Sequence, residues 1–328
     1  MRSMILLASL TACATASPAP MRLVAGDYDL ALAHGGRDRH YLVHVPPQVA
    51  AGKPLPVIVN FHGGGGNAEQ HARWTNMNVL GDREGMLIVY PDGIGPTVLG
   101  HALHTFNSSA ACCGQASKQN VDDVGFTFAA LADLAGRAPV DRTRVYATGM
   151  SNGSMMAQRL AHDAPNRIAA VASISGANDL GDFTLTPPVP LMHIHSVDDP
   201  RALYQGGLGP PFPGTQIRTQ HPPVERVVGE WVKADGCAAT PSVGETKRGA
   251  PGTPDASHTA TKLTWSSCRG GAEVVLWKLT GSGHVWPGEE TRERRLADVL
   301  GESTHVIDAN DEMWVFFKQF SRPDAPPL

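Results

Sequence analysis

The segment Gly149–Gly153 reads Gly-Met-Ser-Asn-Gly and places Ser151 between two glycines. A strand pattern at 144–149 leads into it, and a helix pattern at 154–162 follows it. In that context a tight turn lifts the serine hydroxyl above the strand end, and the glycines relieve crowding in strained backbone. The start of the helix then offers N–H groups to a developing oxyanion. The segment therefore predicts a nucleophilic serine, whereas outside a strand and a helix it would indicate only a glycine-rich turn.

A second glycine-rich segment, His62–Gly66, directly follows the apolar run at 56–61. Backbone without side chains can approach a substrate closely and present its N–H groups. A phosphate-binding loop would need a Lys and a Ser or Thr that are missing here. We expect the N–H group of Gly63 or Gly64, together with that of Asn152, to form an oxyanion hole.

A nucleophilic serine needs a histidine base, and the base needs an orienting carboxylate. On a strand–turn–helix scaffold the chain order is serine, carboxylate, histidine. His284 stands in the glycine-rich segment 281–288, directly after the last predicted strand, and is the predicted base; His305 is the fallback. The carboxylate should follow the predicted strand at 191–195, where Asp198 and Asp199 both qualify by position.

The elements that must position these residues alternate between strand-like and helix-like patterns from about residue 38 to the end. This alternation predicts a mostly parallel sheet with helices on both faces. No repeat, linker or change in composition divides the chain, so one catalytic domain is expected over residues 21–328. The predicted strands lie at 41–45 (an outer strand), 56–61, 86–90, 144–149, 168–174, 191–195 and 273–279, and the predicted helices at 126–135, 154–162, 224–233 and 311–320.

Six segments together resemble the secreted polyhydroxybutyrate depolymerase and feruloyl esterase group of α/β-hydrolases, over about residues 25 to 320. They are GMSNG at 149–153, HGGGG at 62–66, VDDVGF at 121–126, HSVDDP at 195–200, GSGHVWPG at 281–288 and VIDANDEMWVFF at 306–317. The resemblance implies an α/β-hydrolase fold and a serine ester hydrolase without a cofactor or metal. It also selects Asp199, which aligns with the acid of the group's His-Gly-x-x-Asp-Pro stretch. Ser196 stands where the group has Gly, so Asp198 remains an alternative.

The resemblance also bears on the substrate. It implies that Trp286 lines the pocket beside His284, unless it is a hydrophobic anchor for the loop. The long loop at 200–223 is expected to form a wall of the acyl pocket with Tyr204 as a contact, unless it is a surface excursion. Polymer-degrading members often carry a separate binding domain after a linker. No such pattern is present, which favours soluble esters, oligomers or side-group esters of polysaccharides.

Residues 1–20 have the pattern of a short secretory signal, with Arg2 before an apolar stretch. The residues before Cys13 resemble a lipobox, which implies a lipid anchor on that cysteine; cleavage after Ala14 or Ala16 is the alternative, and a start before a cytosolic enzyme is another. We expect an extracellular or periplasmic protein, either free or tethered to a membrane by lipid.

Four cysteines remain after the leader, which suits an oxidising compartment. Cys237 and Cys268 flank an excursion rich in Gly, Thr, Ser and Pro and are expected to pair. The adjacent Cys112 and Cys113, which with Gly114 resemble a CCG element of the family, could be bonded or reduced. His193 and His195 fall on one side of a strand and are expected to be packed histidines rather than metal ligands.

The chain has 328 residues and a net charge of −4, with no long run of Lys or Arg, which argues against a nucleic-acid partner. After residue 20 no apolar stretch reaches the roughly 20 residues of a membrane span. The sequence predicts a secreted serine esterase that forms an acyl-enzyme with polyester-derived, 3-hydroxybutyrate-type esters or with feruloyl or acetyl esters of polysaccharides. The alternatives are a serine peptidase on the same fold and a non-catalytic binding lipoprotein.

Overall fold

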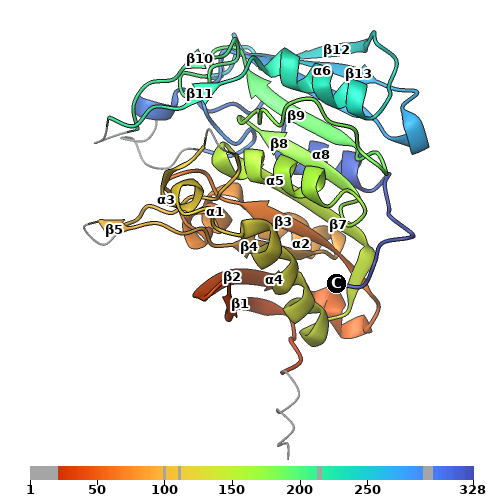
Figure 1. The fold of residues 1–328 in the computed structure, drawn as a ribbon. Helices are drawn as coiled ribbons and strands as arrows, with labels where there is room; N and C mark the ends of the chain where they lie inside the picture. The colour runs from red at the N-terminus through yellow and green to blue at the C-terminus, as the bar shows by residue number, and fades with distance from the viewer. Residues whose placement is uncertain (1–20, 99–100, 110–111, 213–215, 291–297) are drawn as a thin grey trace, which may run out of the picture.

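The computed structural model describes residues 21–98, 101–109, 112–212, 216–290 and 298–328. The predicted leader with Cys13 therefore lies outside the described residues. A ten-stranded sheet with the order β1-β2-β4-β3-β7-β8-β9-β14-β13-β12 forms the centre of the molecule (Figure 1). Its strands are β1 (Gly26–His34), β2 (Arg37–Val45), β3 (Leu55–Phe61), β4 (Leu87–Pro91), β7 (Val140–Met150), β8 (Ala170–Ile174), β9 (Leu191–Ser196), β12 (Ser242–Arg248), β13 (Thr259–Trp265) and β14 (Val274–Thr280).

The six central strands from β4 to β14 all pair in parallel, and the two strands at each edge pair antiparallel. The prediction of a mostly parallel sheet is confirmed. The predicted outer strand is β2, but β1 pairs along its outer side. The remaining short strands are β5 (Thr97–Val98) with β6 (His101–Ala102) and β10 (Gly207–Leu208) with β11 (Gln220–His221).

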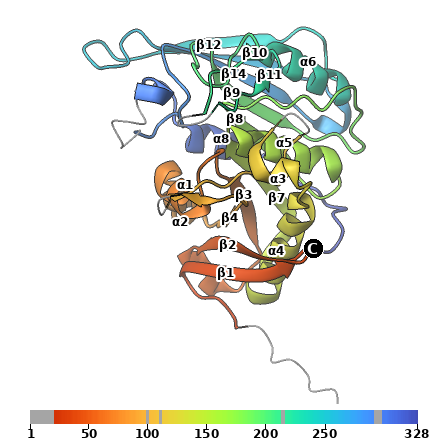
Figure 2. The same cartoon turned by 60° about the vertical axis from the view of Figure 1, so that its left-hand side comes forward.

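Helices cover both faces of the sheet (Figure 2). They are α1 (Ala68–Thr75), α2 (Met77–Glu84), α3 (Gly114–Lys118), α4 (Asp123–Arg137), α5 (Asn152–Asp163), α6 (Val224–Ala234) and α8 (Ala309–Phe317), with short 3-10 turns at Pro47–Ala51 and Arg269–Gly271. No helix within the described ranges combines the length and the apolar character that crossing a bilayer requires.

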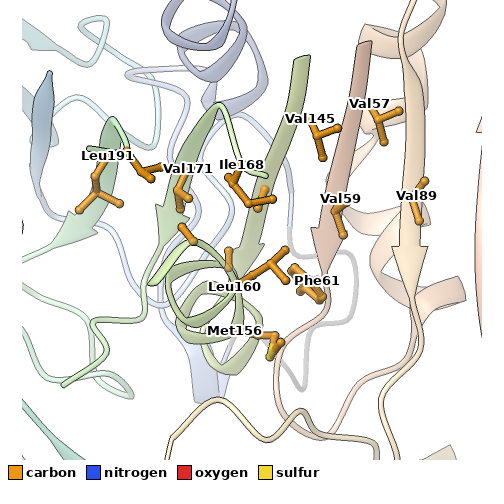
Figure 3. Close-up of a cluster of buried hydrophobic side chains, with 14 of the residues drawn as sticks. Val57, Val59, Phe61, Val89, Val145, Met156, Leu160, Ile168, Val171 and Leu191 are labelled. Carbon is orange, nitrogen blue, oxygen red and sulfur yellow. The ribbon is translucent and has the colours of Figure 1, made fainter. Parts of the chain in front are cut away.

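The two faces of β3 show why the sheet is buried on both sides. Val57, Val59 and Phe61 point into the core that α4, α5 and α6 close, whereas Ile58 packs in the core formed with α1, α2 and α8. Figure 3 shows the first of these cores, with side chains from several strands meeting those of α5. Because residues alternate between faces along a strand, a central strand with two buried faces reads as a continuous apolar run.

The structure joins Cys237 to Cys268, as the sequence predicts, and it also joins Cys112 to Cys113. Cys237 follows α6, and Cys268 follows β13. Next to the bond, the Ala238 N–H donates to the Ser266 carbonyl over 3.0 Å. The bond therefore ties α6 to the β12–β13 hairpin, which extends the sheet beyond β14.

Replacing Cys237 and Cys268 together with serine is expected to lower the melting temperature and to increase protease cleavage between residues 238 and 267. Closing a loop of 31 residues contributes roughly 3–4 kcal/mol in the chain-entropy model. Calorimetry and limited proteolysis test this, and ester hydrolysis at low temperature should survive because neither cysteine contacts Ser151 or His284. Free thiols at both positions in exported protein, or an unchanged melting temperature, would contradict the prediction.

Candidate active site

Ser151 lies on a sharp turn between the last residue of β7 and the first residue of α5. Its backbone is at φ 56° and ψ −118°, a strained conformation that non-glycine residues rarely adopt. The Ser151 N–H donates to the Ile174 carbonyl at 2.8 Å, which fixes the turn on the neighbouring strand β8. The structure therefore gives the predicted nucleophile the strand–turn–helix setting that the sequence indicates.

The glycines around Ser151 are required by close packing. A Cβ atom on Gly149 would lie 2.6 Å from the Phe61 carbonyl oxygen, and one on Gly153 would lie 2.1 Å from the same atom. A Cβ on Gly176 would lie 2.2 Å from the Ser151 carbonyl oxygen. All three separations are too short for a side chain. The turn at 149–153 that carries Ser151, called the elbow below, can therefore form only with glycine at these positions.

The predicted oxyanion donors lie beside the serine. A Cβ on Gly63 would be 3.7 Å from the Ser151 Cβ, and one on Gly64 would be 3.5 Å from the Asn152 Cβ. Asn152 begins α5, so its N–H has no acceptor within the helix. Strand β3 delivers the two glycines and strand β7 delivers Asn152, which brings the N–H groups of both segments to one place.

His62 fixes the backbone that carries Gly63. Its Nε2 accepts the Gly93 N–H at 3.0 Å, so the proton of the neutral ring is on Nδ1. That Nδ1–H donates to the Gly63 carbonyl at 2.8 Å. The histidine at the start of the glycine-rich segment thus orients the peptide from which the oxyanion donors project.

Asp199 and His284 form a buried pair at the same edge of the sheet, after β9 and β14. The His284 Nδ1 lies 2.8 Å from the Asp199 Oδ2, and the residues are 6% and 3% exposed. The Asp199 Oδ1 accepts the N–H groups of Arg201 and Ala202 at 2.7 and 2.8 Å. Burial raises the pKa of the Asp199 carboxyl, but the His284 and His195 imidazoles outweigh it and hold that pKa well below its usual range.

An ionised Asp199 accepts the His284 Nδ1–H, which leaves the Nε2 lone pair free, as a general base requires. Within the described part of the chain, the structure records no hydrogen bond from the Ser151 hydroxyl to His284. Such contacts are commonly long in unliganded enzymes and shorten when substrate binds. β7, β9 and β14 run parallel, so their carboxyl ends bring Ser151, Asp199 and His284 to one edge of the sheet.

Asp198, the alternative acid, points elsewhere. Its side chain is exposed, and its Oδ2 accepts the Gly281 N–H at 2.7 Å. The fallback base also lies away from this pair, because the His305 ring faces Asp255 at 3.9 Å and Glu290 at 3.6 Å. The geometry therefore favours Asp199 and His284 over both alternatives.

Ser196 links the turn that carries Asp199 to the loop that carries His284. Its hydroxyl donates to the Ser282 carbonyl at 2.5 Å and accepts the Asp198 N–H at 3.2 Å. A glycine at position 196, as in the resembling group, could not make either contact. With the Asp198–Gly281 hydrogen bond, this contact braces the two loops against each other on either side of the His284–Asp199 pair.

Ser196→Ala is expected to lower kcat for ester hydrolysis by about 5- to 50-fold, with KM little changed. Small misplacements of catalytic groups reduce rates steeply. The variant removes the contact between the loop that carries His284 and the turn at 196–202 that carries Asp199, called the acid turn below. Steady-state kinetics test this. Ser282→Ala is the matched control, since the acceptor is the Ser282 backbone oxygen and the Ser282 hydroxyl is buried without a partner. Equal kinetics for both variants would exclude a positioning role for Ser196.

His193 and His195 are packed histidines, as the sequence predicts. His195 Nε2–H donates to the Ala202 carbonyl at 2.7 Å, and His193 Nε2 lies 3.0 Å from His195 Nδ1. Burial, reinforced by the nearby His195, lowers the pKa of His193 well below its ordinary value. The pair holds the end of the acid turn at Ala202, next to Asp199.

Two predicted substrate contacts need correction. Trp286 is fully buried, and its indole N–H donates to the Asn310 Oδ1 of α8 at 3.1 Å, so it anchors the His284 loop in the core. Tyr204 is 2% exposed, and its hydroxyl lies 3.1 Å from the Glu225 Oε1 of α6. Neither side chain lies on an open pocket wall, because each is packed between its loop and a helix.

The Asn152 side chain has a role that sequence reasoning missed. Its Oδ1 accepts the Phe106 N–H at 2.7 Å, and its Nδ2 donates to the Phe106 carbonyl and the Ser108 Oγ, each at 3.0 Å. The Asn107 N–H in turn donates to Asp123, which is buried against Arg39 at 2.7 Å. The VDDVGF segment therefore supports the loop that packs against the elbow. No local spacing reveals this contact.

Proteins with similar sequences are named as esterases. The family model described as esterase PHB depolymerase matches residues 39–235. NocK of Nocardia uniformis subsp. tsuyamanensis, whose name calls it an esterase, is 30% identical over 77% of this chain and 72% of its own length. Feruloyl esterase B of Piromyces equi is 26% identical over 87% of this chain but only 46% of its own length, so the chain spans less than half of that relative.

A solved structure supports the same architecture. The acetyl xylan esterase from Aspergillus awamori superposes with a TM-score of 0.51 at 16% identity, covering 84% of this chain and 98% of that one. At this identity the likeness shows the fold alone, which is the α/β-hydrolase fold expected from the sequence.

Proposed function

Because the chain belongs to the esterase PHB depolymerase family, it is a carboxylic ester hydrolase, and we propose that it acts through a triad of Ser151, His284 and Asp199. The observation that carries the triad is the buried His284–Asp199 hydrogen bond of 2.8 Å at the sheet edge where β7 presents Ser151. Such a pair orients an imidazole for general-base work on a serine.

In this mechanism the Ser151 hydroxyl attacks the ester carbonyl while the His284 Nε2 takes its proton. The imidazolium then donates that proton to the leaving alcohol, and Asp199 stabilises the charged ring. Water activated by His284 attacks the acyl-enzyme and releases the acid. The N–H groups of Asn152 and of Gly63 or Gly64 hold the oxyanion in both steps.

The proposed substrate is an ester of the polyester-derived, 3-hydroxybutyrate type, or a feruloyl or acetyl ester of a polysaccharide. The family description and the name of the Piromyces relative support the first two of these classes. A serine peptidase would need stronger activation of an amide leaving group. The sequence contains no charged cluster of the kind that selects peptide side chains.

We also propose that the protein works outside the cytoplasm. The two disulfides in the structure support this, since such bonds persist in oxidising compartments. Lipid attachment at Cys13 remains part of the proposal, and mass spectrometry of the protein isolated from membranes tests it.

The test of the proposed function is hydrolysis by the purified chain of p-nitrophenyl butyrate, methyl ferulate, acetylated xylan and 3-hydroxybutyrate oligomers, with a casein digest as the peptidase arm. Ester cleavage is expected and casein cleavage is not. A chain that cleaves none of the esters would exclude the esterase and favour the binding-protein alternative.

A further inference from the structure

Residues 200–212 and 216–223 are the described parts of the loop that follows Asp199. Its short β10–β11 pair folds the loop back on itself, with Gly207 opposite His221. Near its tip, the Phe212 ring approaches the oxyanion segment, since a Cβ on Gly64 would lie 3.7 Å from the Phe212 Cζ. This part of the loop therefore packs against the segment of the predicted oxyanion donors.

Arg201 is at the base of this wall, two residues after Asp199. Its backbone N–H is held by the Asp199 Oδ1 at 2.7 Å, so the start of the side chain is fixed relative to the triad. Its Nη2 donates to the Pro211 carbonyl at 3.1 Å, and its Cζ lies 5.8 Å from the Phe212 ring centroid. The guanidinium and Gly64 thus both neighbour the Phe212 ring, so the cation lies beside the same side chain that reaches the predicted oxyanion segment.

The Arg201 guanidinium is a partly buried cation that makes no ion pair with any carboxylate of the described residues. One of its five N–H donors is used by Pro211, and the others remain for a ligand. Partial burial lowers the pKa of Arg201 and the nearby Asp199 raises it, and an arginine stays charged in either case. A partly buried cation that lacks an anionic partner has lost hydration that a carboxylate ligand can replace.

His221, a neighbour of Arg201, adds no positive charge beside it at neutral pH. Burial, with the repulsion of His284, His195 and Arg201 outweighing the attraction of Asp199, lowers the pKa of His221 to about 4. His221 is therefore neutral near pH 7. Asp199 is the nearest anion, but its oxygens are already occupied by His284 and by two backbone N–H groups.

We propose that the Arg201 guanidinium binds a free carboxylate of the substrate, so that the enzyme prefers esters that carry a carboxylate a few bonds from the scissile carbonyl. The inference rests on the proposed function and narrows it. A hydroxyalkanoate dimer or short oligomer with a free acid end has this arrangement on the alcohol side of its ester. A hemiester of a dicarboxylic acid has it on the acyl side.

The competing role for Arg201 is to hold the loop, through Pro211 and Phe212, without touching substrate. A scaffold contact changes the hydrolysis of all esters to a similar degree. A carboxylate contact changes the ratio between a charged substrate and its neutral analogue. The experiment therefore measures a ratio of kcat/KM values rather than a single rate.

Two substrate pairs differ only in charge. The 3-hydroxybutyrate dimer and its carboxamide place the group on the alcohol side, and monoethyl succinate and ethyl succinamate place it on the acyl side. Wild-type protein is expected to prefer the acid of at least one pair by about 10- to 100-fold in kcat/KM, the range for a charge-assisted hydrogen bond. The pair that shows the preference identifies the side.

Arg201→Gln is expected to bring that ratio close to one, and Arg201→Lys to restore part of it because the charge is kept but the planar fork is lost. Arg218→Gln is the matched control, because Arg218 is exposed on the same loop, and its ratio should equal that of the wild type. High salt should reduce the wild-type preference.

A wild-type ratio near one for both pairs, or an unchanged ratio in Arg201→Gln, would overturn the inference while leaving the esterase intact. The same holds if the protein cleaves p-nitrophenyl butyrate but neither acid. If it cleaves neither these compounds nor p-nitrophenyl butyrate, the proposed function itself fails, so the two failures are distinguishable.

Discussion

Ser151→Ala is expected to abolish ester hydrolysis, with kcat reduced by several orders of magnitude, while the fold stays intact. Removing a nucleophile that acts together with its base costs about as much as removing the whole triad. The substitution deletes one oxygen and leaves the Ser151 N–H bond to Ile174 unchanged. Kinetics with p-nitrophenyl butyrate and a thermal melt measure the two effects separately.

Ser267→Ala provides the control for this variant. Ser267 is also a non-glycine residue with positive φ, at 58°, but it is exposed and lies beside Cys268, far along the chain from the elbow. Its replacement should leave kcat unchanged. Retention of more than about a tenth of wild-type activity in Ser151→Ala, after excluding contamination by wild-type protein, would remove Ser151 from the nucleophile's role.

Asp199→Asn is expected to lower kcat by about 10³- to 10⁴-fold, the range for this substitution in serine triads. An asparagine would keep its oxygen toward the N–H groups of Arg201 and Ala202, because those donors need an acceptor. Its NH₂ group would then face the His284 Nδ1 and force the ring proton onto Nε2. A base protonated at Nε2 cannot take the serine proton.

Asp198→Asn serves as the matched comparison and should retain activity within a few-fold. Its amide oxygen can still accept the Gly281 N–H that the carboxylate accepts now. Measuring kcat for both variants at the same pH decides between the carboxylates. Greater damage in Asp198→Asn would mean that the acid turn rearranges in the working enzyme and that Asp198 supports His284.

The central sheet and the elbow were predictable because their physical signals are local. β3 reads as a continuous apolar run because both of its faces are buried, and the predicted 56–61 differs from the observed strand only at its first residue. β12 escaped prediction because six of its seven residues are exposed, which leaves no apolar pattern. β1 alternates between partly buried and exposed residues, a weaker signal at the edge of the sheet.

Side-chain roles were harder to predict than backbone roles. The predicted oxyanion positions depend on N–H groups, which a strand–turn–helix context fixes locally. Trp286 and Tyr204 follow the proposed catalytic residues His284 and Asp199 closely in sequence, but nearness along the chain does not determine which way a side chain points. The Asn152 side chain bonds to Phe106, 46 positions away, and the Ser196 hydroxyl donates to the Ser282 carbonyl, 86 positions away. Only the tertiary fold reveals such contacts.

The loop behind the acid turn closes on itself at its base, where the Val224 N–H donates to the Tyr204 carbonyl at 2.9 Å. Tyr204 is also buried against α6, so the two ends of the segment 205–223 are held together independently of what lies between them. The length and composition of this segment can therefore change in evolution, or be altered by engineering, while Asp199 stays in place. Under the proposed mechanism, substrate choice is therefore separable from the placement of Asp199, and new specificities can arise without rebuilding the proposed triad.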